Sequence, residues 1–285
     1  MSTNLKIGFI GQGFIGKNYA NDFEERGYDI VRYDLDSYKK NKIKIKDCDI
    51  VLIAVPTPTT GNGFDDSIVQ TVLPLIGKGK IAVIKSTLQL GTTRKMQKLF
   101  PEIIVMHSPE FLLEKTAGAD ARCPDRNIVG ILDLKDKKLY KQAEIVMSTL
   151  AKAPYNLITL AEQAEIIKYG GNCFFYFKLI FMNSLYDLTK KQNLNYAVIA
   201  EAMSNDPRIG KSHLQVIHQG GRGAGGHCFI KDFEAMIEML HNNNLHDQEK
   251  TFTAIRDLNL KYLEESGKNL DLVAKIYENK KLHSK

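Results

Sequence analysis

The chain has 285 residues, of which 44% are hydrophobic and 25% charged, and a formal net charge of +6 at pH 7. This length is enough for one large or two ordinary domains, and the composition is typical of a soluble globular protein. No apolar run reaches the roughly 18 residues that a membrane-spanning helix needs, and the first residues lack the pattern of a signal peptide. We therefore expect a cytoplasmic protein of two domains that binds no membrane.

The four cysteines lie far apart in the sequence and show no C-x-x-C or His/Cys ligand spacing. This pattern predicts reduced thiols, with neither a disulfide framework nor a metal site. The basic residues are scattered, apart from "YKKNKIKIK" at 38–46. We interpret that stretch as solvated surface and expect no nucleic-acid partner.

The first half of the chain alternates short β-branched runs with helical patterns. The runs expected to be strands are "LKIGFIG", "YDIVRYD", "DIVLIAVP", "KIAVIKST", "EIIVMHSP" and "RNIVGIL". Because these runs are continuously apolar, we expect strands buried on both faces, as in a parallel sheet with crossover helices. The pattern predicts a doubly wound α/β domain over 1–155.

The second half changes in character at about Ala161. From there "LAEQAEIIKYGGNCFFYFKLIFMNSLYDLTKKQ" has apolar positions that recur every three or four residues without strand punctuation. This predicts a long, buried central helix, and the residues after Asp232 again have a helical pattern. We expect an all-α domain over 156–285.

A glycine motif follows the first expected strand. In "IGFIGQGFIGKNYA", three glycines form G-x-G-x-x-G between a strand and a helix, and Asp34 closes the second strand about twenty residues later. Such glycines permit a tight turn, let a pyrophosphate approach the helix N-terminus, and let the helix pack on the strand. Asp34 favours NAD over NADP, because a carboxylate binds a ribose 2′-hydroxyl and repels a 2′-phosphate. This Rossmann motif predicts cofactor contacts from Gly11, Gly13, Phe14, Ile15, Gly16 and Asp34.

A second glycine cluster, "GGRGAGGHCFIKD" at 220–232, surrounds a single cysteine. Glycine loses more conformational freedom on folding than any other residue, so a cluster indicates a sharp turn or a close approach to the backbone. The cluster therefore raises the question of whether Cys228 is the target of such an approach.

Several stretches together resemble one family of enzymes. They are "AVPTPTTGNGFDDS", "KSTLQLGTT", "SPEFLLEKTAGADARCPDRNIVG", "AEIIKYGGNCFFYFKLIFMNSL" and "GRGAGGHCFIKD". These stretches are similar to the UDP-glucose/GDP-mannose dehydrogenase family from about Leu5 to Asp232. The E-x-x-K-x-x-x-N helix and the GG-x-C-x-x-KD loop are the most specific parts of the resemblance.

The resemblance implies an NAD-dependent oxidation of the C6 alcohol of a nucleotide sugar, with UDP-glucose expected, to a carboxylate. A hydride acceptor alone takes an alcohol to an aldehyde, but the next oxidation needs a tetrahedral species. By resemblance, Cys228 supplies it as a thiohemiacetal and then carries a thioester that water hydrolyses. We interpret the glycines around it as space for substrate and nicotinamide.

Other roles transfer by resemblance. Lys168 and Asn172, four residues apart on one helix face, match the pair that stabilises a developing oxyanion, and Glu165 shares that face. Asp232 matches the aspartate that holds an active-site water, and Glu110 the carboxylate assigned to thioester hydrolysis. Further implied catalytic and cofactor residues are Thr87, which orients a water, and Pro56, Thr57, Glu114 and Lys231. Implied substrate contacts are Phe111, Leu112, Lys168, Asn172, Arg208 and Gly225, with Arg208 expected to reach a neighbouring subunit's substrate.

The resemblance also has departures and alternatives. Full-length members of the family continue into a third, nucleotide-sugar-binding domain, and about fifty residues after Asp232 cannot build one. We therefore expect a short form, and a homodimer formed through the long helix. Two other functions stay open: a two-electron dehydrogenase of the β-hydroxyacid or 6-phosphogluconate type, which needs no cysteine, and a non-catalytic subunit that binds NAD and a sugar nucleotide.

Overall fold

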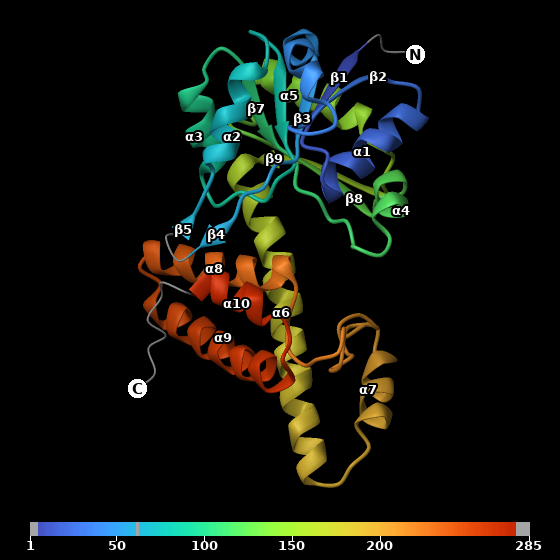
Figure 1. The fold of residues 1–285 in the computed structure, drawn as a ribbon, viewed down its shortest axis with the longest axis vertical. Helices are drawn as coiled ribbons and strands as arrows, with labels where there is room; N and C mark the ends of the chain where they lie inside the picture. Colours follow the sequence, from blue (N-terminus) through green and yellow to red (C-terminus); the bar gives the residue numbers. More distant parts are fainter. Residues whose placement is uncertain (1–4, 61–62, 278–285) are drawn as a thin grey trace. The chain divides into compact units, whose positions relative to one another are not determined.

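The computed structural model describes residues 5–60 and 63–277 (Figure 1). The chain divides into two compact units. The first unit comprises Met1–Thr57 and Asp65–Lys168, and the second comprises Pro58–Phe64 and Tyr169–Lys285. The assignment of an NAD-binding domain to 1–155 and a helical domain to 156–285 stays a prediction. Within the described residues, no helix is both long enough and apolar enough to cross a bilayer.

The first unit is built on a seven-stranded sheet in the order β2-β1-β3-β6-β7-β8-β9. Its strands are β1 (Lys6–Ile10), β2 (Asp29–Tyr33), β3 (Ile50–Ile53), β6 (Ile81–Ile84), β7 (Ile104–His107), β8 (Arg126–Ile131) and β9 (Tyr155–Leu160). All six predicted runs form strands, which confirms the doubly wound fold class. Of these seven strands only β9 was not predicted, because Asn156 and Thr159 interrupt its apolar run and most of its residues are exposed or half-buried.

The sequence predicted a parallel sheet, but one pair of neighbouring strands in the observed sheet is antiparallel. The strands from β2 to β7 are parallel, β8 pairs with β7 in the antiparallel direction, and β9 is parallel to β8. The apolar run of β8 is buried along five of its six residues, and a strand buried on both faces reads the same in either direction. Its orientation was therefore absent from the sequence pattern.

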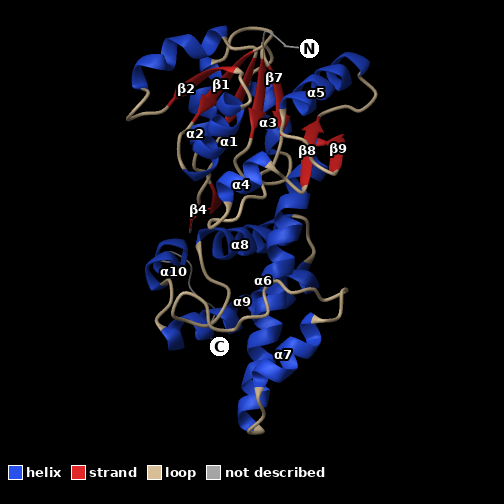
Figure 2. Cartoon of the chain, turned by 90° about the vertical axis from the view of Figure 1, so that its right-hand side faces the viewer, coloured by secondary structure: helices blue, strands red, loops and turns tan. Residues whose placement is uncertain are grey.

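Helices cover both faces of this sheet (Figure 2). They are α1 (Phe14–Glu25), α2 (Ser67–Val72), α3 (Thr92–Leu99), α4 (Ala117–Arg122) and α5 (Lys137–Thr149), with the 3-10 turns η1 (Lys39–Asp47) and η2 (Leu73–Leu75). Phe9 and Phe23 pack edge to face at 5.3 Å in the core under α1. Ile10 and Ile53, which alternate with the residues of that core, are also buried. The sheet is therefore enclosed on its two sides.

The second unit is helical, as predicted, apart from a small hairpin of β4 (Thr59–Thr60) and β5 (Gly63–Phe64). Its helices are α6 (Ala161–Lys191), α7 (Tyr196–Ser204), α8 (His227–Asn242), α9 (His246–Ser266) and α10 (Leu270–Tyr277). The 31-residue α6, drawn in yellow in Figure 1, confirms the long helix; its first residues belong to the first unit. The rings of Tyr176 and Phe233 stack at 3.7 Å and join α6 to α8 in the core.

Candidate active site

The glycine-rich turn of the first unit assigns a separate task to each of its glycines. Gly11 has φ of +87°, and a Cβ on it would lie 2.3 Å from the carbonyl oxygen of Ala54. A Cβ on Gly16 would lie 2.0 Å from the carbonyl oxygen of Gly11, so packing alone requires glycine at both positions. Gly13, the N-cap of α1, has nothing within 4 Å of such a Cβ. The open space above a helix N-terminus fits the pyrophosphate of a dinucleotide.

Asp34 lies directly after β2 and is tied to the same turn. One carboxylate oxygen accepts a hydrogen bond from the backbone N–H of Gln12 at 3.0 Å, and the other from Asp36 N–H at 2.9 Å. Arg32, the nearest cation in the sequence, pairs with Glu24 at 2.6 Å. The Asp34 side chain is therefore held next to the cofactor turn, while the neighbouring Arg32 guanidinium is paired with Glu24.

The sheet order places the cofactor loops at a switch point. β1 lies between β2 and β3, so the connections that leave β1 and β3 diverge, and ligands of doubly wound sheets bind beyond the carboxyl ends of such strands. After β3, Pro56 is exposed and Thr57 is buried, with its hydroxyl donating to the backbone oxygen of Thr87 at 2.8 Å. The predicted residues Pro56, Thr57 and Thr87 therefore belong to two loops that are bonded to each other.

Glu110 and Lys168 form a buried ion pair in the first unit. Lys168 Nζ lies 2.8 Å from Glu110 Oε1, and the two side chains are 7% and 6% exposed. The second oxygen of Glu110 accepts from Leu112 N–H at 2.8 Å, and the Phe111 ring centroid lies 5.7 Å from Lys168 Nζ. The structure thus brings together four residues that the sequence assigned to catalysis and substrate binding. Removing one partner of such a pair leaves an uncompensated buried charge.

Lys85 is a neighbouring group that the sequence reasoning missed. Its side chain is buried, its ammonium lies 3.2 Å from the Ser108 hydroxyl and 4.3 Å from the Tyr19 ring centroid, and it also donates to Pro109. Burial lowers the pKa of Lys85 to about 7, although the nearby Glu110 acts in the opposite direction. The signal was present, because Lys85 opens the "KST" stretch from which only Thr87 was selected.

Glu165 has a structural task within the first unit. Its carboxylate accepts hydrogen bonds from Gly91 N–H at 2.6 Å, from Thr93 N–H at 2.7 Å and from the Thr93 hydroxyl at 2.6 Å. Burial raises the pKa of Glu165 to about 7, while these donors act to lower it. The carboxylate therefore ties α6 to the turn that begins α3.

In the second unit, Cys228 is the second residue of α8 and is exposed. The helix is preceded by Gly226, which has φ of +83° and nothing within 4 Å of a built Cβ. The N-terminal end of a helix favours negative charge, so this position favours charge that develops on Sγ. The geometry suits a nucleophile that a substrate can reach.

Three side chains from α9 and the turn after it hold the cysteine loop. Asn259 makes hydrogen bonds to both the N–H and the carbonyl of Ala224, at 2.7 and 3.0 Å. Lys268 donates to the carbonyl of Gly223 at 3.1 Å, and Asn269 accepts from Gly226 N–H at 2.9 Å. The backbone of the loop is thereby fixed on both sides of its turn.

This packing revises our interpretation of the glycines. A Cβ on Gly221 would lie 2.7 Å from Lys268 Cβ, and one on Gly225 only 2.3 Å from Asn269 Oδ1. A Cβ on Gly223 would lie 2.7 Å from Asn259 Oδ1. At these three positions it is the protein itself that approaches the backbone. Asn259, Lys268 and Asn269 belong to no motif, so no sequence signal selects them.

Asp232 organises the polar groups next to the cysteine. It is 1% exposed, accepts from Asn172 Nδ2 at 2.5 Å, and pairs with Lys231 Nζ at 2.6 Å. The structure therefore brings together three residues from two predicted motifs. Because both carboxylate oxygens are engaged, Asp232 orients an amide and an ammonium.

Two predicted residues lie on exposed segments. Arg208, in the loop after α7, has a side chain that is 88% exposed and pairs with Asp206 at 2.6 Å. Glu114 is exposed in the turn before α4. The structure leaves the roles of both residues as predictions.

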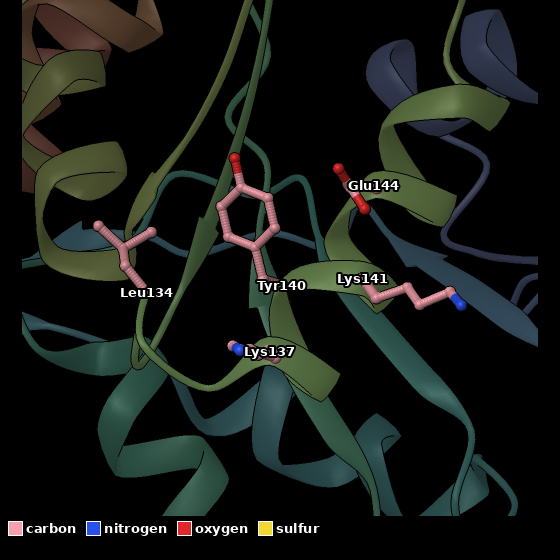
Figure 3. A pocket seen from close by; sticks show the side chains of 5 residues that line it. All are labelled: Leu134, Lys137, Tyr140, Lys141 and Glu144. Atoms are coloured by element: carbon pink, nitrogen blue, oxygen red, sulfur yellow. The ribbon is translucent and has the colours of Figure 1, made fainter.

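The first unit also has a hollow on its surface, and the residues that line it are distant in the sequence from the candidate site residues. Figure 3 shows it at the start of α5, lined by Leu134, Lys137, Tyr140, Lys141 and Glu144. Its lining contains none of the predicted site residues. We assign it no part in the site.

Comparison with known proteins identifies the family. The chain matches the NAD binding domain of the UDP-glucose/GDP-mannose dehydrogenase family over residues 39–146 and its central domain over residues 162–261. A UDP-glucose 6-dehydrogenase of Rhizobium meliloti (strain 1021) is 27% identical over 285 residues, covering 84% of this chain and 64% of that protein. The chain spans 64% of the length of that protein and 35% of the length of another relative, an uncharacterized protein of Methanocaldococcus jannaschii.

Solved structures agree with this relation. A UDP-glucose dehydrogenase from the hyperthermophilic archaeon Pyrobaculum islandicum superimposes with a TM-score of 0.77 at 25% identity, covering 93% of this chain and 69% of that one. The 3-hydroxyisobutyrate dehydrogenase of Mycobacterium tuberculosis shares the fold at 14% identity, with a TM-score of 0.70 and coverage of 93% and 95%. NAD is the cofactor that the matched domain binds. The chain belongs to the UDP-glucose/GDP-mannose dehydrogenase family.

Proposed function

We propose that this chain oxidises the C6 primary alcohol of a nucleotide sugar, UDP-glucose, to the uronic acid, with Cys228 as the nucleophile. The observation that carries the proposal is an exposed cysteine in the first turn of α8. Three side chains fix the backbone of the loop that leads into this turn. A two-electron oxidation has no use for such a thiol. The family and its relatives supply the substrate class.

The proposed reaction balances in four steps. The alcohol loses a hydride and a proton to give an aldehyde. The Cys228 thiolate adds to the aldehyde carbon and forms a thiohemiacetal, which loses a second hydride and a proton to leave a thioester. Water then cleaves the C–S bond, which releases the carboxylate and the thiol. NAD, when bound, accepts one hydride in each oxidation, so each sugar consumes two NAD.

The residues of each unit support these steps in different ways. We assign the Lys168 ammonium to the stabilisation of a developing alkoxide, and Glu110, 2.8 Å away, holds that ammonium in place. Asp232 lies one turn after Cys228 on α8, and it keeps the amide of Asn172 and the ammonium of Lys231 in a fixed orientation. We assign Lys168 and Asn172 to oxyanion stabilisation, and Glu110 to the hydrolysis of the thioester.

The two alternatives differ from this proposal in what they ask of Cys228. The fold is shared with a 3-hydroxyisobutyrate dehydrogenase, so fold alone does not separate a four-electron from a two-electron enzyme. A two-electron dehydrogenase would be indifferent to the thiol, and a non-catalytic subunit would produce no NADH. The fixed cysteine loop favours the four-electron reaction.

We also propose a homodimer that forms through α6. Phe174, Phe181 and Leu188 are 65%, 59% and 55% exposed, and they recur every seven residues along this helix. A heptad of large apolar side chains forms one stripe on a helix, which is the pattern of a helix that packs against another helix. A second copy of α6 would cover this stripe.

The test of the function is the ratio of NADH formed to sugar consumed. Purified protein is incubated with limiting UDP-glucose, GDP-mannose or a dTDP-sugar, NADH is followed by absorbance, and the product is identified by mass. We expect a ratio of two and a carboxylate from UDP-glucose. A ratio of one with an aldehyde or ketone product would assign the two-electron reaction, and no NADH with any sugar would favour the binding subunit.

A further inference from the structure

Three metal-ligating side chains meet outside the candidate active site, where α8 ends and α9 begins. His241 lies in the last turn of α8, and His246 and Glu249 lie in the first turn of α9. Their ligand atoms all lie within 4.8 Å of one another. His241 Nδ1 is 3.1 Å from one oxygen of Glu249, and His246 Nδ1 is 3.3 Å from the other. Two imidazoles therefore direct the same ring nitrogen toward one carboxylate.

The turn between the helices holds these side chains in a defined relation. Three backbone hydrogen bonds close it: Asn243 N–H to Met239, Asn244 N–H to His241, and Leu245 N–H to Leu240, at 3.2, 3.0 and 3.0 Å. Asn244 has φ of +58°, a conformation that asparagine tolerates better than most residues. The two histidines are thus presented by a closed turn, and their convergence does not depend on a long flexible loop.

We propose that His241, His246 and Glu249 bind a divalent transition-metal ion, Zn²⁺. Zinc bonds of about 2.0–2.1 Å in a tetrahedral arrangement separate neighbouring ligand atoms by about 3.3 Å. The two histidine nitrogens lie 3.1 and 3.3 Å from different oxygens of Glu249, and one ligand atom from each residue lies within 4.8 Å of the other two, so small side-chain rotations bring the three atoms to zinc distances. Two neutral imidazoles and one carboxylate suit zinc better than magnesium or calcium, which prefer oxygen. Three protein ligands leave the fourth position to water.

The site has a defined consequence for the second unit. A metal ion at this turn links the end of α8 to the start of α9. The same α8 begins with Cys228, and α9 carries Asn259, which holds Ala224 of the cysteine loop. Metal binding therefore stabilises the helix pair that fixes the loop. The histidine side chains are 63% and 58% exposed, so an ion from solution has access to them.

The experiment measures metal binding to the full chain in a Cys123→Ser, Cys228→Ser background, because exposed thiols would otherwise compete for the ion. After treatment with a chelator and its removal, Zn²⁺ is titrated by calorimetry and Co²⁺ by its visible absorption. We expect one equivalent of each ion and a raised unfolding temperature with Zn²⁺. His241→Ala, His246→Ala and Glu249→Gln should each weaken Zn²⁺ binding by at least about tenfold.

His218→Ala is the matched control, since it removes an exposed histidine outside the cluster and should leave the affinity unchanged. Unfolding temperatures without metal show that each variant is folded. Absence of saturable binding, or binding that Glu249→Gln and His241→Ala leave intact, would overturn the proposal and leave a hydrogen-bonded triad.

Discussion

The two units present their candidate catalytic groups in opposite ways. In the first unit, Glu110 and Lys168 are almost completely enclosed and bonded to each other, with the buried Lys85 close to the same loop. In the second unit, Cys228 is exposed, and it is the surrounding backbone that is held by side chains. The first unit holds its charged groups in place by pairing them, whereas the second unit holds in place the backbone next to the Cys228 thiol.

The contrast teaches where stability and activity are coupled. A buried ion pair contributes to both, because the loss of one partner leaves the other charge without compensation. An exposed thiol on a helix end supports little of the core, so its removal should change chemistry alone. Variants in the two units should therefore separate the two kinds of effect.

The largest expected effect is that of Cys228→Ala. This change removes the nucleophile, so acid formation should fall at least about a thousandfold, to background, while the unfolding temperature stays unchanged. Iodoacetamide should label Cys228 ahead of Cys173, which is buried and whose thiol has its pKa raised by burial. Cys173→Ala is the matched control and should retain labelling and activity. Retained acid formation in Cys228→Ala would break the comparison.

Lys168→Met should affect both properties. Loss of one charge that stabilises a developing oxyanion typically slows a reaction about a hundred- to a thousandfold, and it leaves Glu110 buried and unpaired at a cost of about 3–5 kcal/mol. Adding Glu110→Gln to Lys168→Met should restore much of the free energy of unfolding without restoring the rate. Chemical denaturation and steady-state kinetics on the wild type and the two variants measure the two effects. Equal recovery of both would show that the rate loss reflects misfolding.

The sequence predicted those features whose physical signal is local. Continuous apolar runs predicted six strands. The motif also predicted Gly11 and Gly16, because at each position a Cβ would clash with one backbone carbonyl. The direction of β8 could not be predicted, because five of its six residues are buried and an apolar run of this kind has the same pattern in either direction. Local signals thus determined the elements but not every pairing.

The parts of the site that come from distant segments were harder to predict. Asn259 and Lys268 fix the cysteine loop from α9 and the turn after it, 35 and 45 residues away from their partners. Their residue types have many surface uses, so nothing in the sequence marks them. Lys85 was overlooked for a different reason, since a lysine at a strand end is ordinarily solvated. Burial, which only the fold reveals, is what distinguishes it.

Glu165 offers a pH test of enclosure in the first unit. Burial raises its pKa from an ordinary value of 4.5 to about 7, so the folded state holds a proton that the unfolded state releases. The stabilisation is complete below pH 4.5 and is lost as the pH rises through about 7, by about 3 kcal/mol. Glu165→Gln cannot titrate, so the wild-type unfolding free energy minus that of the variant should fall across this window.

The variant also loses hydrogen bonds to the turn at Gly91 and Thr93, but that cost is independent of pH and shifts the whole difference by a constant. Urea denaturation of both proteins between pH 4.5 and 8 gives the profile. A difference that stays flat would mean that the three donors keep the carboxylate ionised in spite of its burial.

The smallest expected effect is that of Asp34→Ala on cofactor choice. Loss of a charged hydrogen-bond partner costs about 1–3 kcal/mol, so the affinity for NAD should fall roughly fivefold to 150-fold, and the affinity for NADP should fall less. The structure adds a complication, because the carboxylate also accepts from Gln12 N–H in the glycine-rich turn. A weaker turn would reduce binding of both cofactors equally.

Asp34→Asn separates the two contributions, because its amide oxygen still accepts from Gln12 N–H but carries no charge. If the charge selects NAD by repelling a 2′-phosphate, Asp34→Asn should bind NADP better than the wild type does, whereas Asp34→Ala should lose affinity through the turn as well. Asp36→Ala is the matched control, since its backbone N–H, the group that donates to Asp34, remains. Calorimetric titration of NAD and NADP into the four proteins measures these differences. A wild type that prefers NADP, or an Asn variant with an unchanged ratio of affinities, would assign Asp34 to the turn alone and leave cofactor choice to other residues of the first unit.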